Sequence, residues 1–243
     1  VMPDRTNRLL SRWADQVSTV DRSAAEIFDR AVVNGQPVRP ELLETDPITA
    51  RRTLDIPTEA FVLLVTGGSQ GARRLNVATT GALGKLFEDP DIHVIHLTGQ
   101  GKMPDLAALD RAGVALEQYH VFEQRDDMAT VLAAADIVLT RAGASSLAEA
   151  SAWERPMIVV PYPHAGGHQR YNAIAYEESG AAIVVEDQQM TASRLVELVG
   201  DLKQNPHRRY QMAKAAAEMG SRYAAERIVD ELMRLAGKDP HPA

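Results

Sequence analysis

The chain has 243 residues, of which 45% are hydrophobic and 24% are charged, and its formal net charge is -7 at pH 7. This composition is ordinary for a globular protein with a sizeable core, and the excess of acid argues against a nucleic-acid partner, because such surfaces need concentrated Lys and Arg. The sequence has no cysteine, which excludes disulfide scaffolds, thiolate zinc sites and cysteine nucleophiles, and no apolar run approaches the ~20 residues that span a bilayer.

The first element in chain order is an expected amphipathic helix over residues 6–20. Its apolar side chains at helical spacing are Leu9, Leu10, Trp13 and Val17. Such a stripe needs a partner surface to cover it. Because Val1-Met2-Pro3 resembles neither an initiator nor a signal peptide, we expect that surface to belong to an upstream domain.

The next segment, residues 32–40, predicts a junction between domains. Its Gly and two Pro residues prevent either neighbouring helix from continuing through it. We therefore divide the chain into residues 1–40, the remnant of a preceding domain with the junction, and residues 41–243, the main domain.

From residue 61 onward, short apolar strands alternate with helices. The predicted strands are residues 61–66, 93–98, 115–121, 137–140, 157–161 and 181–185. The predicted helices are residues 72–88, 106–112, 127–135, 146–153 and 168–179, a helix capped by Thr191, and a helical tail after Pro206. Gly113 and Gly180 stand where helix C-terminal caps are expected. This alternation indicates a doubly wound parallel sheet covered on both faces, an α/β fold.

The first predicted strand leads into a glycine-rich turn over residues 67–71. Gly67, Gly68 and Gly71 allow a tight turn whose free amides, with the positive end of the following helix dipole, can face an anion. The turn has neither G-x-G-x-x-G spacing nor a Gly-Lys-Ser/Thr ending, which argues against dinucleotide oxidoreductases and P-loop NTPases. An ordinary strand-to-helix turn remains the alternative to an anion site.

A second glycine turn follows a later strand, over residues 141–149. Ser145 or Ser146 can cap the helix and offer hydroxyls to a phosphate, while Glu149 can accept bonds from ribose hydroxyls. The alternative for Glu149 is an acid that only favours the helix dipole. Two such turns on one sheet suggest a diphosphate ligand that carries a sugar.

A third polar segment, residues 161–172, reaches the same edge, because ligands bind beyond the carboxyl ends of parallel strands. His168 and Gln169 open a helix after a Gly-Gly turn, where they can bond sugar hydroxyls. His164 either covers a phosphate or is a solvated capping residue.

Several motifs in this order resemble the MurG family of UDP-N-acetylglucosamine–N-acetylmuramyl-(pentapeptide) pyrophosphoryl-undecaprenol N-acetylglucosamine transferases. The motifs are Gly35-Gln36-Pro37-Val38-Arg39, Gly67-Gly68-Ser69-Gln70-Gly71-Ala72, Asp127-Met128 leading to Ala134-Ala135-Asp136, Arg141-Ala142-Gly143-Ala144 with Ser146 and Glu149, and His168-Gln169 with Asn172-Ala173. Gln36 stands where the family usually has Asn, and Arg125 where an apolar residue is common. The match covers nearly the whole chain.

The resemblance implies the C-terminal, Rossmann-like domain of a GT-B glycosyltransferase, which holds UDP-GlcNAc, together with a helical remnant of the N-terminal domain. Ala144 to Glu149 would hold diphosphate and ribose, Arg125 would lie by the uracil through its backbone, and His168 with Gln169 would hold the GlcNAc. The residues expected to bind the donor are Arg39, Gly68, Ser69, Gln70, Gly71, Arg125, Ala144, Ser145, Ser146, Leu147, Ala148, Glu149, His168 and Gln169.

The implied reaction is inverting GlcNAc transfer to a lipid-linked muropeptide during bacterial peptidoglycan synthesis. The catalytic base, the acceptor cleft and the contact with the cytoplasmic face of the membrane would belong to an N-terminal domain upstream of Val1, so the isolated chain is expected to be inactive. No metal or cofactor is expected beyond the donor itself. The alternatives are a UDP-GlcNAc 2-epimerase and a non-catalytic nucleotide-sugar-binding subunit of a split transferase.

Overall fold

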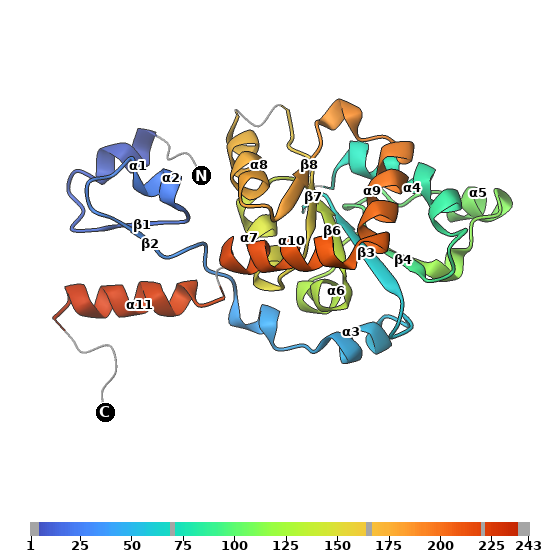
Figure 1. The fold of residues 1–243 in the computed structure, drawn as a ribbon, viewed down its shortest axis with the longest axis horizontal. Coiled ribbons are helices and arrows are strands. Elements are labelled where there is room, and N and C mark those ends of the chain that lie inside the picture. Colours follow the sequence, from blue (N-terminus) through green and yellow to red (C-terminus); the bar gives the residue numbers. More distant parts are fainter. Residues whose placement is uncertain (1–4, 69–70, 164–166, 220–221, 238–243) are drawn as a thin grey trace.

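A computed structural model of the chain describes residues 5–68, 71–163, 167–219 and 222–237, and within them a six-stranded parallel sheet forms the centre (Figure 1). The strands in sheet order are β5 (Tyr119–Phe122), β4 (Ile92–Leu97), β3 (Phe61–Thr66), β6 (Ile137–Thr140), β7 (Met157–Val159) and β8 (Ala182–Val184). The predicted doubly wound parallel sheet is confirmed.

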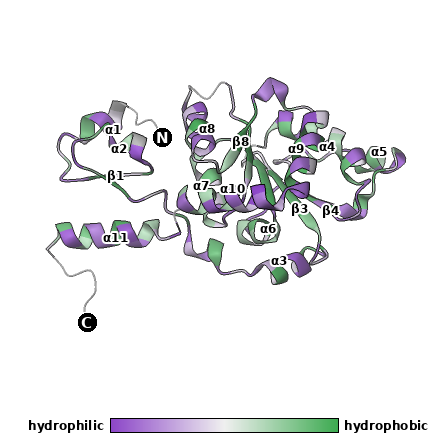
Figure 2. Cartoon of the chain, in the orientation of Figure 1, coloured by the Kyte–Doolittle hydropathy of each residue, from purple (hydrophilic) through white to green (hydrophobic). Residues whose placement is uncertain are grey.

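Helices cover both faces of this sheet. They are α3 (Pro47–Thr53), α4 (Arg73–Leu86), α5 (Leu106–Arg111), α6 (Met128–Ala134), α7 (Ala144–Ala152), α8 (His168–Glu178), α9 (Ala192–Gln204) and α10 (Pro206–Met219). Successive side chains of a strand point to opposite faces, so Val62 and Leu64 pack in the core with α6 and α7, whereas Leu63 and Val65 pack with α4 and α9. Figure 2 shows the strands as a hydrophobic centre between helices of mixed hydropathy.

The predicted helix ends are confirmed at three positions. Gly113 (φ +78°) and Gly180 (φ +82°) follow α5 and α8 in the left-handed conformation that glycine adopts readily. At the start of α9 the Thr191 hydroxyl accepts a hydrogen bond from the Arg194 amide at 3.2 Å.

The predicted strand over residues 115–121 is wrong in its first half. Leu116–Gln118 form a 3-10 turn, and β5 begins at Tyr119. The buried Gln118 side chain donates to the carbonyl oxygens of Asp89 (3.0 Å) and Ile92 (2.7 Å), which ties the turn to the start of β4.

The N-terminal segment departs further from expectation. The helix predicted over residues 6–20 is wrong beyond Leu10, because the chain forms only α1 (Arg5–Leu10) and then β1 (Val17–Thr19), which pairs in parallel with β2 (Ala31–Val33). The connecting helix is α2 (Arg22–Ala25), capped by the Asp21 carboxylate. The described part of the segment before the junction is thus a small α/β unit and not the expected helical one, since hydrogen bonding to β2 draws Val17 out of the helical pattern.

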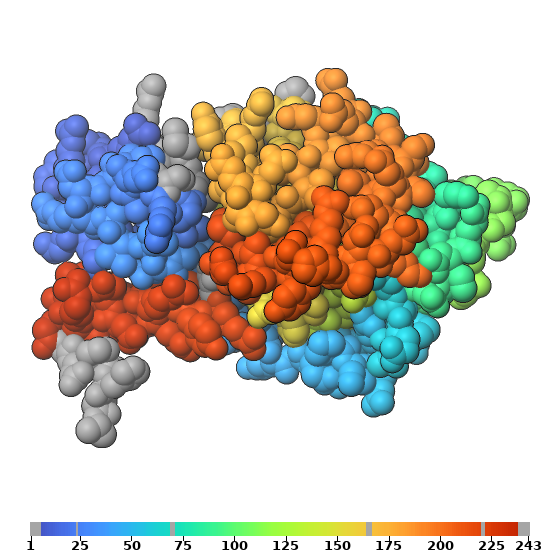
Figure 3. Space-filling model, in the orientation of Figure 1, coloured from blue at the N-terminus to red at the C-terminus, as the bar shows by residue number. Residues whose placement is uncertain are grey.

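The last helix, α11 (Ala224–Leu235), lies beside this N-terminal segment and away from the sheet (Figures 1 and 3). The Gln16 amide donates to the Glu231 carboxylate at 3.4 Å across that contact. Helix α10 packs on α7 and α9 and buries Met212 and Ala216, whereas Leu232 on α11 is 60% exposed. Among the described residues, no helix combines the length and apolar character needed to cross a membrane.

Candidate functional site

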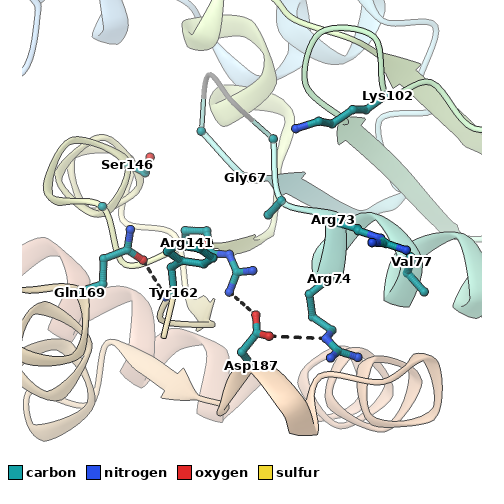
Figure 4. Close-up of a pocket in the computed structure, with 14 residues that line it drawn as sticks. Gly67, Arg73, Arg74, Val77, Lys102, Arg141, Ser146, Tyr162, Gln169 and Asp187 are labelled. Carbon is teal, nitrogen blue, oxygen red and sulfur yellow. Dashed lines mark hydrogen bonds and ion pairs between the residues drawn. The ribbon is translucent and has the colours of Figure 1, made fainter. Parts of the chain in front are cut away.

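A cavity of about 880 Å³ opens at the carboxyl edge of the sheet (Figure 4). Its walls come from the segments that follow β3, β4, β6, β7 and β8 and from the first turns of α4, α7 and α8. The described lining residues are Gly67, Gly68, Gly71, Ala72, Arg73, Arg74, Val77, Lys102, Arg141, Gly143, Ser146, Tyr162, Gln169 and Asp187. The expectation that polar segments converge at this edge is met.

The first glycine turn forms one wall of the cavity, and at Gly71 its backbone leaves no room for a side chain. Gly68 (φ +75°) and Gly71 (φ +63°) are both left-handed, and the Gly71 amide donates to the Gly68 carbonyl at 2.8 Å. A Cβ atom on Gly71 would lie 2.1 Å from the Thr98 carbonyl oxygen. Ser69 and Gln70, both predicted donor contacts, lie outside the described residues. Helix α4 follows, and its N-cap residue, Ala72, supplies no side-chain cap to the first amides.

The second glycine turn differs in detail from its prediction. The N-cap of α7 is Gly143 and no side chain caps the helix, so the expected capping by Ser145 or Ser146 is wrong. The helix begins earlier than predicted because the backbone of Gly143 already accepts the Leu147 amide at 3.0 Å. Ser146 is thereby placed on the cavity wall, where its hydroxyl is available to a ligand.

The remaining predicted residues of this turn take different positions. Ala144 is the first residue of α7 and Ser145 is exposed. Leu147 and Ala148 are buried, with Leu147 in the core beneath the turn. Their side chains support the helix that carries Ser146, and they do not line the cavity.

Glu149 lies half-buried on α7, one turn after Ser146. Burial raises the pKa of its carboxyl group, while the positive charge of Arg39 acts in the opposite direction. The structure therefore places two predicted donor contacts within electrostatic reach of each other, although neither lines the cavity.

Helix α8 brings Gln169 to the cavity. Its side-chain oxygen accepts a hydrogen bond from the Tyr162 amide at 2.9 Å, and both residues line the wall. His168, the first residue of α8, is exposed and is not a lining residue. His164 lies outside the described residues.

Arg125 lies in the segment after β5 and outside the cavity lining. Its guanidinium carbon is 4.7 Å from the centre of the Phe122 ring, and Nη2 is 3.7 Å from the Asp127 carboxylate. The side chain is thus engaged locally, with Phe122 and Asp127.

The side chains that dominate the floor of the cavity have no predicted role in the sequence motifs. Arg141 Nη1 lies 2.6 Å from Asp187 Oδ1 and donates to the Val160 carbonyl oxygen at 3.1 Å, and Arg74 Nε lies 3.5 Å from Asp187 Oδ2. The available signal was position, since Arg141, Lys102 and Asp187 all follow predicted strands closely.

The cavity is positively charged, although the chain as a whole is acidic. Its cationic lining residues are Arg73, Arg74, Lys102 and Arg141, and Asp187 is the one acid among the described lining residues. Cations combined with uncapped helix starts favour an anionic ligand such as a diphosphate. In the described part of the chain, no cluster of three or more His, Asp or Glu side chains is suited to hold a metal ion.

Comparison with known proteins agrees with this geometry. Residues 62–228, which contain the whole cavity, match the model of the glycosyltransferase family 28 C-terminal domain. The chain belongs to this family. As a member of family 28 it has a parallel sheet and glycine turns that form a GT-B C-terminal domain, as the motifs implied.

Individual relatives support the resemblance to the MurG family. The UDP-N-acetylglucosamine--N-acetylmuramyl-(pentapeptide) pyrophosphoryl-undecaprenol N-acetylglucosamine transferase of Desulforudis audaxviator is 39% identical over 98% of this chain, which spans 66% of that relative. The protein of the same name from Desulforamulus reducens is 36% identical over 93% of this chain and 63% of its own length. The chain therefore spans slightly less than two thirds of these relatives.

Solved structures show the same likeness. MurG of Acinetobacter baumannii superposes with a TM-score of 0.72 and 26% identity over 96% of this chain and 64% of that structure. A structure described as a putative UDP-N-acetylglucosamine 2-epimerase from Listeria monocytogenes reaches 0.68 at 19% identity, over 98% of this chain and 64% of its own. At that identity the second match shows a shared fold only.

Proposed function

We propose that this chain is the donor-binding part of an inverting glycosyltransferase that moves GlcNAc from UDP-GlcNAc to a lipid-linked MurNAc-pentapeptide. The observation that carries the proposal is the positively charged cavity between two glycine turns, at the edge of the sheet where family 28 and MurG relatives also match. A nucleoside diphosphate sugar has the charge and the polar groups that this cavity can satisfy.

Each part of the donor has a proposed set of contacts. The diphosphate lies against the Gly68–Gly71 turn and the start of α7, where Ser146 supplies a hydroxyl. The carboxylate of Glu149 accepts bonds from the ribose, with Arg39 beside it. Gln169 reaches the GlcNAc, and the backbone at Arg125 borders the uracil. Ser69, Gln70 and His168 complete the set by resemblance alone.

The chemistry assigned to these residues is binding and charge stabilisation. The acceptor hydroxyl attacks the anomeric carbon of GlcNAc, its proton passes to a base, and UDP leaves with inversion. Cations and helix amides preorganised around the diphosphate stabilise the negative charge that grows on the departing UDP. We assign the base and the acceptor site to the third of the relatives' length that this chain does not span, together with contact with the cytoplasmic face of the membrane.

Calorimetric titration with a panel of nucleotides tests the donor assignment. UDP and UDP-GlcNAc should bind more tightly than ADP-glucose or GDP-mannose, because the cavity lacks an adenine-type fingerprint and resembles that of a uridine-diphosphate-sugar family. Equal affinity for all three bases would overturn the assignment.

A transfer assay tests whether the acceptor site and the base lie outside this chain. With radiolabelled UDP-GlcNAc and the lipid-linked acceptor, this chain alone should transfer negligible sugar, and a protein extended upstream by the missing third should transfer it. Turnover by the chain alone would show that the acceptor site has been assigned to the wrong part of the enzyme.

A further inference from the structure

The Asp187 carboxylate lies between two arginines that come from distant parts of the sequence (Figure 4). Oδ1 is 2.6 Å from Arg141 Nη1, after β6, and Oδ2 is 3.5 Å from Arg74 Nε, in the first turn of α4. We propose that Arg74 is a further diphosphate-binding residue and that Asp187 competes with the ligand for it. In the free protein Asp187 holds Arg74, and in the complex Arg74 turns to the diphosphate while Asp187 stays with Arg141. This inference rests on the proposed function.

The two contacts of Asp187 differ in a way that decides which arginine can move. The Arg141 side chain is 10% exposed and its Nη1 also donates to the carbonyl oxygens of Val160 (3.1 Å) and Pro161 (3.4 Å). Its guanidinium carbon lies 5.4 Å from the centre of the Tyr162 ring. A buried cation with these acceptors needs a counterion and has little freedom to leave it. Arg141 is therefore the fixed partner.

Arg74 has the opposite character. Its side chain is 43% exposed, and its ion pair with Asp187 is too long for a hydrogen bond. Exposed ion pairs of this kind contribute little to stability, so a ligand can replace one at low cost. Arg74 also lines the cavity as the second residue of α4, whose start has no side-chain cap. An anion at this helix start would thus meet the Arg74 guanidinium.

Asp187 stays with Arg141, and its charge opposes an anion in the cavity. Its Oδ1 is buried and accepts no hydrogen bond of good geometry from the described residues, despite the short distance to Arg141. A carboxylate at the floor of an anion site repels the incoming phosphates, and its attraction for Arg74 must be overcome before that cation can serve the ligand. Both effects make Asp187 weaken diphosphate binding relative to a neutral residue at the same position.

Titration of variants with UDP, uridine and inorganic pyrophosphate tests this inference. Arg74→Gln should weaken UDP and pyrophosphate binding by about 3- to 10-fold and leave uridine binding unchanged. This is less than the loss of a full charged hydrogen bond would cause, because Arg74 gives up its ion pair with Asp187 when it binds the anion. Asp187→Asn should strengthen binding of both anions by about 3-fold. Arg74→Gln should cost more affinity in the Asp187→Asn background than in the wild type, because the free-state competitor is then absent.

A matched control is a cation on α9 that does not line the cavity. Arg194 on α9 is 39% exposed and pairs with Glu197 at 2.7 Å, so Arg194→Gln removes an equivalent cation without touching the site. It should leave all three affinities unchanged. Melting curves of each variant identify any that does not fold, and Arg74→Gln alone suffices if Asp187→Asn is one of them.

The outcomes separate this inference from the proposed function. If the wild type binds UDP but Arg74→Gln binds it equally well, or if Asp187→Asn weakens UDP and uridine together, the exchange is overturned and Asp187 only maintains the cavity. If the protein shows no preference for uridine nucleotides, but Arg74→Gln still weakens pyrophosphate binding by about 3- to 10-fold, the proposed function fails and the exchange of Arg74 between Asp187 and the diphosphate stands. If pyrophosphate binds without dependence on Arg74, the exchange fails.

Discussion

The side-chain amide of Asn172 on α8 donates a hydrogen bond to the carbonyl oxygen of Ala142, at 2.9 Å. Ala142 lies in the turn between β6 and α7, directly before the Gly143 N-cap, and Asn172 is only 7% exposed. One buried bond therefore joins the turn of the proposed diphosphate site to the helix that carries Gln169. The two sides of the cavity are held at a fixed separation.

Replacement of Asn172 by Ala should loosen this connection. The Ala142 carbonyl would be left buried without its donor, which costs about 1–3 kcal/mol of unfolding free energy, and UDP-GlcNAc affinity should fall because the α7 turn and α8 are no longer aligned. Urea unfolding and calorimetry on the same variant measure both effects. Asn205→Ala removes an exposed amide that bonds only within the end of α9, and it should change stability by less than about 0.5 kcal/mol and affinity not at all. Similar losses of stability and affinity in the two variants would contradict a specific role for the bond between Asn172 and Ala142.

Glu149→Gln should separate ligand affinity from stability. Because burial raises the pKa of this carboxyl above its ordinary value, the unfolded chain gives up the proton more readily, and the ionised group destabilises the fold as pH rises through the folded-state pKa. At pH 7 the Gln variant should therefore be at least as stable as the wild type. Its UDP-GlcNAc affinity should nevertheless drop at least about tenfold, since charged hydrogen bonds to the ribose are lost.

The control for this experiment is Glu218→Gln, an exposed acid on α10 outside the cavity lining. This variant should change neither the stability of the protein nor its affinity for UDP-GlcNAc. Unchanged UDP-GlcNAc affinity in Glu149→Gln would remove Glu149 from the site.

Acid should destabilise the fold through its buried histidines. Burial lowers the pKa of His96 to about 4. In the neutral ring Nε2 donates to the Asn76 side-chain oxygen (3.1 Å), and Nδ1 accepts from the Tyr119 hydroxyl (2.8 Å). Because the unfolded chain binds the proton more readily, stability is complete above about pH 6.5 and falls as pH drops toward 4. A pKa shift of this size lowers the unfolding free energy by about 3 kcal/mol once His96 is protonated. Burial also lowers the pKa of His120 to about 4, which adds to the same trend.

Urea unfolding between pH 7.5 and 4.5 measures this dependence. His96→Gln keeps a polar side chain but removes the titrating ring, so its stability should depend less steeply on pH below 6.5 than that of the wild type. His207→Gln, at an exposed position on α10, should retain the full slope. If the unfolding free energy depended on pH equally steeply in all three proteins, groups other than His96 would govern acid unfolding.

The two left-handed glycines of the first turn should respond differently to alanine. At Gly68 a Cβ has no heavy atom within 4 Å, so only the left-handed backbone opposes it, at about 1–2 kcal/mol. At Gly71 the backbone is also left-handed, and an added Cβ would in addition lie 2.1 Å from the Thr98 carbonyl oxygen. Gly71→Ala should therefore destabilise the protein by clearly more than Gly68→Ala. Melting temperatures of the two variants compare them directly. Equal melting temperatures would show that the turn can shift away from β4.

Short-range patterns predicted most of the sheet and helices. The apolar runs at residues 61–66 and 137–140 became β3 and β6 with unchanged bounds, because strands buried on both faces are continuous apolar segments. The helix over residues 6–20 failed for the converse reason. Its spacing is compatible with a helix, but partnership with β2, 14 residues away in register, decides the conformation of Val17.

The glycine turns and the helix that opens at His168 were set by residues that are neighbours in the chain, since backbone freedom and capping act over a few residues, and the sequence alone sufficed to predict them. The cavity floor was decided only by the tertiary structure. Arg74, Arg141 and Asp187 are far apart in the sequence, and each stands in an unremarkable local context. They meet because parallel crossovers bring the carboxyl ends of β3, β6 and β8 to one edge, where burial of Arg141 requires a counterion and Asp187 is the acid within reach.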